Sequence, residues 1–352
     1  FKLKEGVSKV LVKYHEKGYI DADVQTSVTS RADRKNEVDI EVLLKEGPRA
    51  KVKAVEFEGV TAFKTKKLIK QISLRPKKVF DVKKLEEDQR EIEKYYKGRG
   101  YPDYELVDST YTFSADRTGV TIRLTIKEGL QSRFGETSFS GNEVYDAKAL
   151  KKTVSYRVGK LFDAERFGET IAMIQDKYAE KGRLRTRVEP IKTVNPKTGF
   201  TDIEFKITEG SVVYVDHVDV EGNTATKTYV LKREITQKEG QAFSSVKVRK
   251  SQEKLFNLGF IEDVQVDIQS PADPDHVDMV FAVTEGKPGM LTAGVGYSSI
   301  GGIIGTLSVS HMNLFGRAQR LSLVWQFGAR VQDYSVNWST RWLGESPTSL
   351  SI

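Results

Sequence analysis

The stretch KYYKGRGYPDYELV, from Lys94 to Val107, joins the end of a helix to an extended run. Gly100 suits a left-handed helix stop, because glycine lacks the Cβ that disfavours positive φ. The same arrangement, a helix end followed in three cases by an aromatic residue, occurs four times: YHEKGY from Tyr14, YKGRGY from Tyr96, YAEKGR from Tyr178 and LFNLGF from Leu255. Four occurrences predict a repeated unit.

The spacing around these helix ends is nearly constant. Each is followed by two strand-like runs and a Glu-Gly pair, and the closing glycine comes 29, 29, 28 and 27 positions after the helix-ending glycine. Upstream lie an extended run and two helical stretches, and the second helix begins with a Phe followed by a capping oxygen: Asp81, Asp163 and Ser244. These residues predict N-caps with a hydrophobic staple. One unit therefore reads β-α-α-β-β over roughly 80 residues.

The expected fold class is α+β, with tandem β-α-α-β-β repeats followed by antiparallel strands. We expect the second half of a repeat at 1–48, complete repeats at 49–129, 130–210 and 211–287, and a different segment at 288–352.

The last segment has an unusual composition: seven of the 66 residues from Lys287 to Ile352 are charged, and all three tryptophans lie there. Its runs alternate between an apolar and a small or polar face. The apolar positions include Leu291, Ala293, Val295, Tyr297, Tyr334, Val336, Trp338 and Trp342. This pattern predicts the first strands of a transmembrane β-barrel, truncated because about four strands fit here and the smallest barrels have about eight. A β-sandwich is the alternative.

Composition excludes several function classes. The net charge of +7 comes from Lys and Arg interleaved with Asp and Glu, as in DVKKLEEDQREIEKYYK, which favours a solvated helix face over nucleic-acid binding. With no cysteine, disulfides, thiolate zinc sites and cysteine nucleophiles are excluded.

We expect no enzyme, and no catalytic, cofactor or metal site. The four histidines, His15, His217, His276 and His311, are isolated in the sequence, and no G-x-S-x-G nucleophile elbow is present. GVGYSSIGG, from Gly294 to Gly302, has serine at the third glycine of a dinucleotide-binding motif.

Together, the F-x-G-N, G-Y/F and E-G signatures and the segment NLFGRAQRLSL resemble the polypeptide-transport-associated (POTRA) repeats and first barrel strands of BamA-type assembly factors. The resemblance implies a bacterial outer-membrane protein whose periplasmic repeats bind unfolded outer-membrane proteins and help insert them. It also implies accessory periplasmic lipoproteins and outer-membrane lipid as partners, and no nucleic acid. A two-partner-type secretion pore and a soluble periplasmic scaffold are the alternatives. Two-partner pores typically carry two repeats, whereas three complete repeats and half of a fourth are expected here, which favours an assembly factor over a secretion pore.

The resemblance also implies local roles. Edge strands would receive clients by β-augmentation at Tyr104, Glu105, Leu106 and Val107, and at Val264, Gln265, Val266, Asp267 and Ile268. Arg233 and Glu239 would dock an accessory lipoprotein. The lateral seam of the barrel would be the strand that carries Leu291, Ala293, Val295 and Tyr297.

Overall fold

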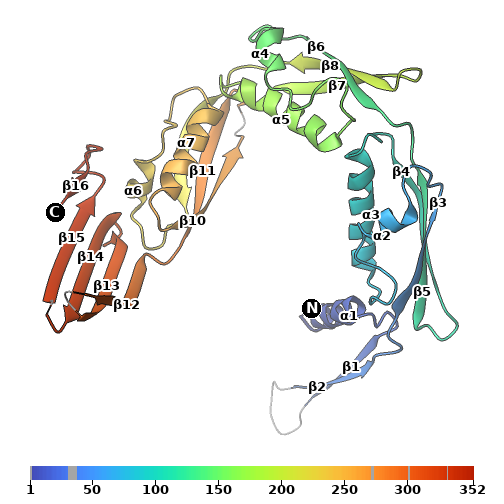
Figure 1. Ribbon diagram of the computed structural model, residues 1–352, viewed down its shortest axis with the longest axis horizontal. Helices are drawn as coiled ribbons and strands as arrows, with labels where there is room; N and C mark the ends of the chain where they lie inside the picture. The colour runs from blue at the N-terminus through green and yellow to red at the C-terminus, as the bar shows by residue number, and fades with distance from the viewer. Residues whose placement is uncertain (1, 31–37, 271–272, 300–301, 331) are drawn as a thin grey trace. The chain divides into compact units, whose positions relative to one another are not determined.

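The computed structural model describes residues 2–30, 38–270, 273–299, 302–330 and 332–352 (Figure 1). It begins with α1 (Lys2–Glu16), β1 (Asp23–Ser30) and β2 (Val38–Lys45), and the two strands pair antiparallel. Two compact units form. The first comprises Phe1–Ser140, Ala147–Ile171 and Pro190–Phe205, and the second comprises Gly141–Asp146, Ala172–Glu189 and Lys206–Ile352.

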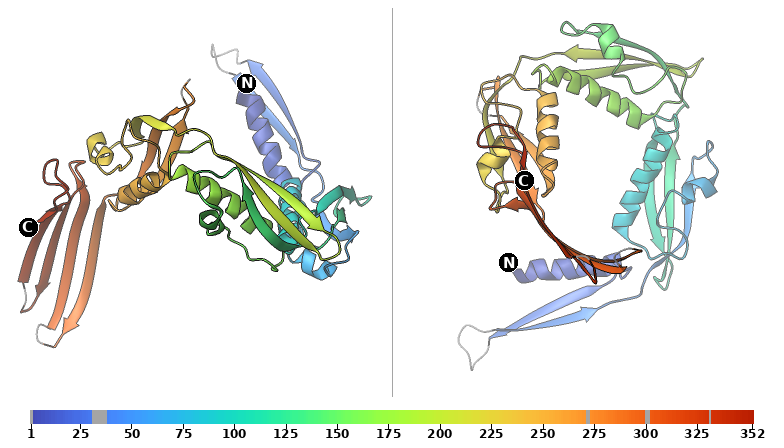
Figure 2. Two further views of the ribbon diagram at one scale, coloured as in Figure 1. Left: turned by 90° about the horizontal axis from the view of Figure 1, so that it is seen from above. Right: turned by 60° about the vertical axis from the view of Figure 1, so that its left-hand side comes forward.

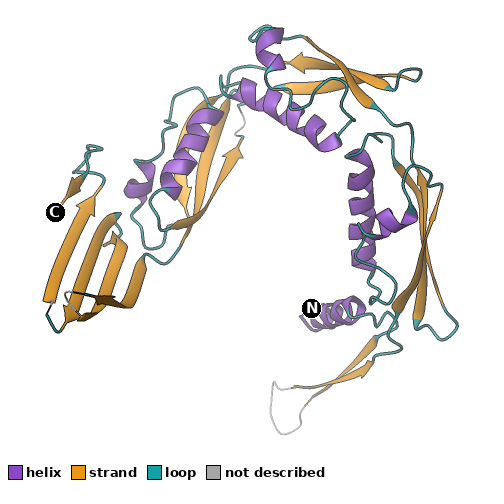
Figure 3. Ribbon diagram, viewed as in Figure 1, coloured by secondary structure: helices purple, strands orange, loops and turns teal. Residues whose placement is uncertain are grey.

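Three successive segments follow the β-α-α-β-β order (Figure 3). The first contains β3 (Lys51–Glu58), α2 (Thr65–Ile69), α3 (Val82–Lys97), β4 (Glu105–Phe113) and β5 (Gly119–Lys127). The second contains β6 (Arg133–Ser140), α4 (Ala147–Lys151), α5 (Ala164–Ala179), β7 (Arg187–Asn195) and β8 (Phe200–Thr208). The third contains β9 (Tyr214–Glu221), α6 (Thr228–Lys232), α7 (Ser245–Phe256), β10 (Ile261–Gln269) and β11 (His276–Glu285). The expected α+β class and repeat order are confirmed.

In each repeat the last strand is central. The strand orders are β3-β5-β4, β6-β8-β7 and β10-β11-β9. In the first and third repeats the central strand pairs parallel with the first strand and antiparallel with the second. The second strand of each repeat, β4, β7 or β10, therefore lies at a sheet edge.

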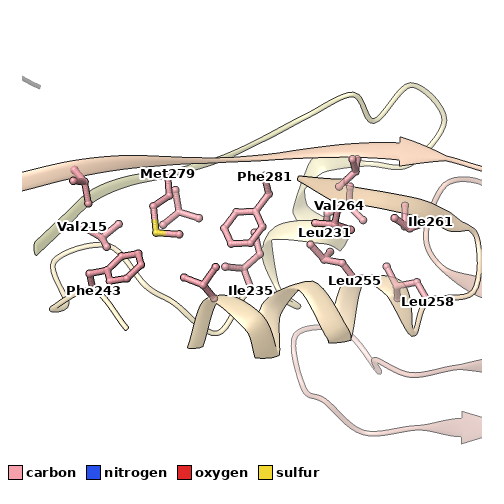
Figure 4. Close-up of a cluster of buried hydrophobic side chains, with 14 of the residues drawn as sticks. Val215, Leu231, Ile235, Phe243, Leu255, Leu258, Ile261, Val264, Met279 and Phe281 are labelled. Carbon is pink, nitrogen blue, oxygen red and sulfur yellow. The ribbon is translucent and has the colours of Figure 1, made fainter. Parts of the chain in front are cut away.

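The core of each repeat lies between the sheet and the helix pair. On β11, Val277, Met279, Phe281 and Val283 alternate inward and are at most 4% exposed. Figure 4 shows Met279 and Phe281 pointing from the strand toward the helical side, where Leu255 lies. Full burial of such a side chain stabilises the fold by about 1.5–3 kcal/mol, so the alternation holds the sheet on the helices.

The helix caps agree with the sequence in two repeats out of three. Asp81 Oδ1 accepts a hydrogen bond from the Lys83 N–H at 3.0 Å, and Asp163 Oδ1 accepts one from the Glu165 N–H at 3.0 Å. The expected cap at Ser244 was wrong, because its side chain makes no cap hydrogen bond. The start of α7 is tied down by Gln237 instead, whose Oε1 accepts from the Ser244 N–H at 3.1 Å.

The last segment forms an antiparallel sheet of β12 (Gly289–Ser298), β13 (Gly302–Leu314), β14 (Gln319–Gly328), β15 (Gln332–Thr340) and β16 (Leu350–Ser351), in that order (Figure 2). Its register confirms the alternation. One row across four strands contains Leu291, Val309, Leu323 and Val336, which are 70%, 45%, 43% and 65% exposed. The neighbouring row contains Thr292, Ser308, Val324 and Ser335. One face of the sheet is therefore apolar and uncovered.

Trp342 does not belong to this apolar face, contrary to the sequence expectation. Strand β15 ends at Thr340, and the indole Nε1–H of Trp342 donates to the Glu234 carboxylate at 2.6 Å. Across the described ranges, no helix is long and apolar enough to cross a membrane.

Candidate functional site

The Glu-Gly pair that closes the first repeat places a carboxylate inside the fold. Glu128 is 8% exposed and accepts hydrogen bonds from the Tyr96 hydroxyl at 2.7 Å, the Thr61 hydroxyl at 2.6 Å and the Ala62 N–H at 3.0 Å. Burial acts to raise the pKa of Glu128, but these hydrogen bonds outweigh it and the pKa is lowered. The ionised glutamate therefore joins the end of α3 to the loop after β3, next to the start of the edge strand β4.

The closing glutamate also binds the loop after the first strand in the other two repeats, but it binds the helix tyrosine only in the second. Glu209 accepts from the Tyr178 hydroxyl at 2.9 Å and from the Val144 N–H at 2.8 Å. In the third repeat the tyrosine is replaced by Leu255, and Glu285 instead accepts three backbone N–H groups, those of Thr224, Ala225 and Thr226, at 2.8–2.9 Å. Sequence reasoning missed this role, although the nearly constant distance between tyrosine and glutamate signals it.

The edge strand β4 carries three of the four residues expected there. It begins at Glu105, so Tyr104 lies outside the strand, and its ring stacks on Tyr96 at 4.8 Å. Leu106 belongs to the strand, and Val107 lies at a β-bulge where it is 57% exposed. The exposed backbone edge of β4 therefore starts at Glu105.

A groove of about 420 Å³ runs between α3 and this edge. Its lining includes Gln89 and Glu93 from the helix, and Tyr104, Glu105 and Leu106 from the strand side. The Tyr104 hydroxyl is buried and has no hydrogen-bond partner in the described part of the chain. Burial, with a smaller contribution from Glu93, raises the pKa of Tyr104 to about 12, so the hydroxyl remains a donor. We name this feature the α3–β4 groove.

The edge strand β10 is partly closed at its start. The Val264 carbonyl accepts from the Gln252 side chain at 3.1 Å, and its N–H donates to Asp263 at 2.9 Å. Both backbone groups of Val264, one of the residues expected at a client-binding edge, are therefore already hydrogen-bonded to side chains. Val266 and Ile268 pack against the core, whereas Gln265 and Asp267 are exposed. The accessible part of this edge lies beyond Val264.

The two residues expected to dock a lipoprotein are in different surroundings. The Arg233 guanidinium lies 5.0 Å from the Trp342 ring centre, and its Nε is buried without a partner among the described residues. Burial lowers the pKa of Arg233. Glu239 is exposed, and its carboxylate accepts the Val218 N–H at 3.1 Å. Arg233 is therefore half-buried against an internal aromatic ring, whereas Glu239 is exposed.

That internal contact joins the third repeat to the C-terminal sheet. Besides the bond between Trp342 and Glu234, Asn313 donates to the Thr226 hydroxyl at 2.8 Å, and the Lys227 N–H donates to the Gly316 carbonyl at 3.0 Å. We call these contacts the α6 latch. The sequence carried no periodic signal for it, because its residues lie outside the repeated positions.

The expected seam strand is β12, which lies at the edge of its sheet and pairs with β13. Val295 and Tyr297 are 83% and 81% exposed, and Leu291 and Ala293 are also exposed. A Cβ placed on Gly294 or Gly296 would meet no described atom within 4 Å. These glycines are therefore not imposed by close packing.

Two of the histidines that look isolated in the sequence pair across strands. His217 Nδ1 lies 2.8 Å from Asp278, and His276 Nδ1 lies 2.5 Å from Asp216, so β9 and β11 exchange two His–Asp contacts. Hydrogen bonding to these aspartates raises the pKa of both histidines. Among the described residues, no group of three potential metal ligands is present.

A family model described as "POTRA: Surface antigen variable number repeat" matches residues 50–129, 132–210 and 213–286, which is more than half of the chain. This chain belongs to the POTRA repeat family. The chain is similar to outer membrane protein assembly factor BamA from Neisseria meningitidis serogroup B, at 28% identity over 91% of this chain and 41% of the relative. BamA from Neorickettsia risticii is 28% identical over 87% of this chain and 42% of its own.

Solved structures show the same POTRA fold. POTRA repeats 3–5 of Haemophilus influenzae BamA match with a TM-score of 0.60 at 23% identity, covering 67% of this chain and 96% of theirs. Haemophilus ducreyi BamA lacking POTRA domains 1–3 matches with a TM-score of 0.54 at 22% identity, covering 62% of this chain and 42% of its own. The resemblance to BamA-type proteins is confirmed. The chain spans about two fifths of the length of the curated relatives.

Proposed function

We propose that this chain is part of a machine that assembles outer-membrane proteins without covalent chemistry. The observation that carries the proposal is the direct connection of POTRA repeats with open sheet edges to a sheet with one exposed apolar face. The curated relatives named above are outer membrane protein assembly factors, which supports the same role here. Its clients would be unfolded β-barrel polypeptides.

The POTRA repeats would hold clients by β-augmentation. An edge strand offers unpaired N–H and C=O groups, so an extended client can pair with it whatever its sequence. Strand β4 from Glu105 and strand β10 beyond Val264 are the proposed edges, with the α3–β4 groove beside the first. Side chains of the client would fill this groove.

The C-terminal sheet would be the first part of an outer-membrane barrel. Soluble monomers rarely expose a large contiguous apolar patch, whereas an apolar row crosses four strands of this sheet. Residues 288–352 would then lie in the outer membrane in contact with lipid, and the POTRA repeats would lie in the periplasm. Residues 1–48 would be the second half of a further repeat. The edge strand β12 would form the seam at which a client strand is templated.

Accessory proteins remain part of the proposal. Glu239 is the exposed candidate for contact with a periplasmic lipoprotein, and Arg233 lies against Trp342 beside the α6 latch. A secretion pore of the two-partner type is less well supported, because three complete POTRA matches exceed its typical two repeats. A soluble scaffold leaves the apolar face unexplained.

Photo-crosslinking in cells tests the proposal. A photoreactive residue is placed in the full-length protein at Gln265 on the β10 edge, at Val295 on β12 and, as a control, at the exposed Ala282 on the central strand β11. Crosslinks from the first two positions to several outer-membrane proteins, with few from Ala282, would support assembly. Crosslinks to one secreted protein would favour the secretion pore, and none would favour the scaffold.

A further inference from the structure

A hollow of about 700 Å³ lies beside the start of β6; it is lined by the second repeat and by Gly98 at the end of α3. Four cationic side chains line it against a single carboxylate, that of Asp163; the cations are Arg133, Arg157, Lys160 and Arg166. We call this feature the basic hollow.

Two of the cations are held in place by the loop that they face. Arg133 Nη1 donates to the Gly159 carbonyl at 2.9 Å, and Arg166 Nη1 donates to the Ser155 carbonyl at 3.1 Å. Asp163 offsets part of this charge, because its carboxylate caps α5 and forms an ion pair with Arg166, with Oδ2 4.0 Å from Nε. Three cations remain without a carboxylate in the lining of the hollow.

The other two cations, Arg157 and Lys160, are exposed, and neither side chain has a hydrogen bond or ion pair in the described ranges. The equivalent positions in the third repeat, by alignment of the two loops, are Lys238 and Gln241. In the first repeat the equivalent residues are Arg75 and Lys78, but the Arg75 guanidinium donates to the Ile72 and Lys70 carbonyls at 3.0 and 2.9 Å. The arginine without a partner among the described residues therefore distinguishes the second repeat from the first.

Apolar groups line the same hollow. Phe134 and Tyr156 stack at 3.9 Å with an interplanar angle of 7° and form its buried floor, and Leu161 at its rim is 37% exposed. The loop is fixed on β6, since the Phe134 N–H donates to the Lys160 carbonyl at 2.9 Å and the Gly159 N–H donates to the Phe134 carbonyl at 2.8 Å. Arg157 and Lys160 therefore lie on a loop that backbone hydrogen bonds hold against β6.

We infer that the basic hollow binds an acidic segment of an extended polypeptide. Carboxylates suit arginine, whose planar fork can bind both oxygens of one carboxylate, and lysine adds a point charge. The apolar side chains of the same segment would contact Leu161 and Val158, which is 61% exposed beside the cations. A free inorganic anion would use the charges alone. This recognition differs from β-augmentation, because it depends on the charged side chains of the bound segment rather than on its backbone hydrogen-bonding groups.

The test measures binding of two labelled ten-residue peptides to the full-length protein by fluorescence anisotropy. One peptide alternates Asp and Glu with Val and Leu, and the other has Asn and Gln in place of the acids. The double variant R157Q/K160Q should raise the Kd of the acidic peptide about tenfold and leave the amide peptide within about twofold. Both substitutions are at exposed positions, so folding is retained.

The variant K83Q/K84Q is the matched control, because it removes two exposed lysines from α3 outside the hollow. It should leave both affinities within about twofold. Equal affinity for the two peptides, or an equal loss in the two variants, would overturn the inference. So would binding of inorganic phosphate, or of vesicles of phosphatidylcholine with phosphatidylglycerol, that depends on Arg157 and Lys160 while the acidic peptide does not bind.

Discussion

Tyr96 and Glu128, 32 residues apart, share a hydrogen bond of 2.7 Å inside the first repeat. The tyrosine is fully buried, and the carboxylate also holds the loop after β3 through Thr61 and Ala62. One side-chain pair therefore fixes three segments of the repeat, and the Y-x-x-x-G-Y and E-G signatures belong to a single structural device.

The first prediction is that Y96F destabilises this repeat by about 1.5–3 kcal/mol, the usual contribution of a hydrogen bond to a charged group. Chemical unfolding monitored by circular dichroism measures the loss. Y95F is the control, because the adjacent hydroxyl makes no hydrogen bond recorded among the described residues. Equal stability of Y96F and the parent protein would contradict the role of the pair.

The second prediction concerns pH. Burial acts to raise the pKa of Glu285, but hydrogen bonds from Ala225, Thr226 and Thr224 outweigh it and lower the pKa to about 2. A lowered folded-state pKa contributes stability above the unfolded value, near 4.3, and this stability is lost as pH falls toward 2. Unfolding of the third repeat, followed by hydrogen exchange of β11 between pH 5 and pH 2, should show the loss. E285Q should be less stable at neutral pH and should flatten this profile.

A third prediction distinguishes two glycines. Gly100 has φ +93°, and a Cβ there would lie 2.9 Å from the Ser132 carbonyl oxygen, whose residue also donates its N–H to Gly100 O at 2.6 Å. G100A should cost about 1–3 kcal/mol, because it adds left-handed strain and a clash. G168A, inside α5 with open space around it, should be neutral or stabilising by up to about 1 kcal/mol. Thermal unfolding of both variants measures the difference, and equal effects would contradict the assignment.

These features also show how far the sequence determines the structure. Repeat order and strand alternation were predictable, because both are visible as local patterns in the sequence. In the strands the pattern is the alternation of apolar residues at every second position, as from Val277 to Val283 and from Leu291 to Tyr297. The contacts of the closing glutamates and the α6 latch were not predicted, because they join residues far apart, as Trp342 and Glu234 are by 108 positions. The preference for serine at a helix N-cap led to a wrong prediction at Ser244, because the Gln237 side chain binds the start of this helix instead.

Similarly, the sequence could assign the edge residues to a strand, but it could not show whether their backbone groups are free or already hydrogen-bonded. The sequence places Val264 on β10, yet only the structure shows that the Gln252 side chain already uses its carbonyl. The basic hollow was also unpredicted, since its cations come from β6, the loop before α5 and α5 itself.

The fourth prediction concerns the α6 latch. W342F keeps an aromatic ring under Arg233 but removes the N–H that satisfies Glu234, a carboxylate only 7% exposed. Leaving a buried acceptor unpaired is costly, so the latch should open more often. Hydrogen exchange by mass spectrometry should show faster exchange at Lys227, whose N–H bonds to Gly316, by about tenfold if the loss is about 1.4 kcal/mol. W338F, on the apolar face of β15, is the control and should leave Lys227 unchanged. Unchanged protection in W342F would mean that the backbone contacts between α6 and the turn after β13 hold without the indole, and the latch would then rest on Asn313 and Gly316.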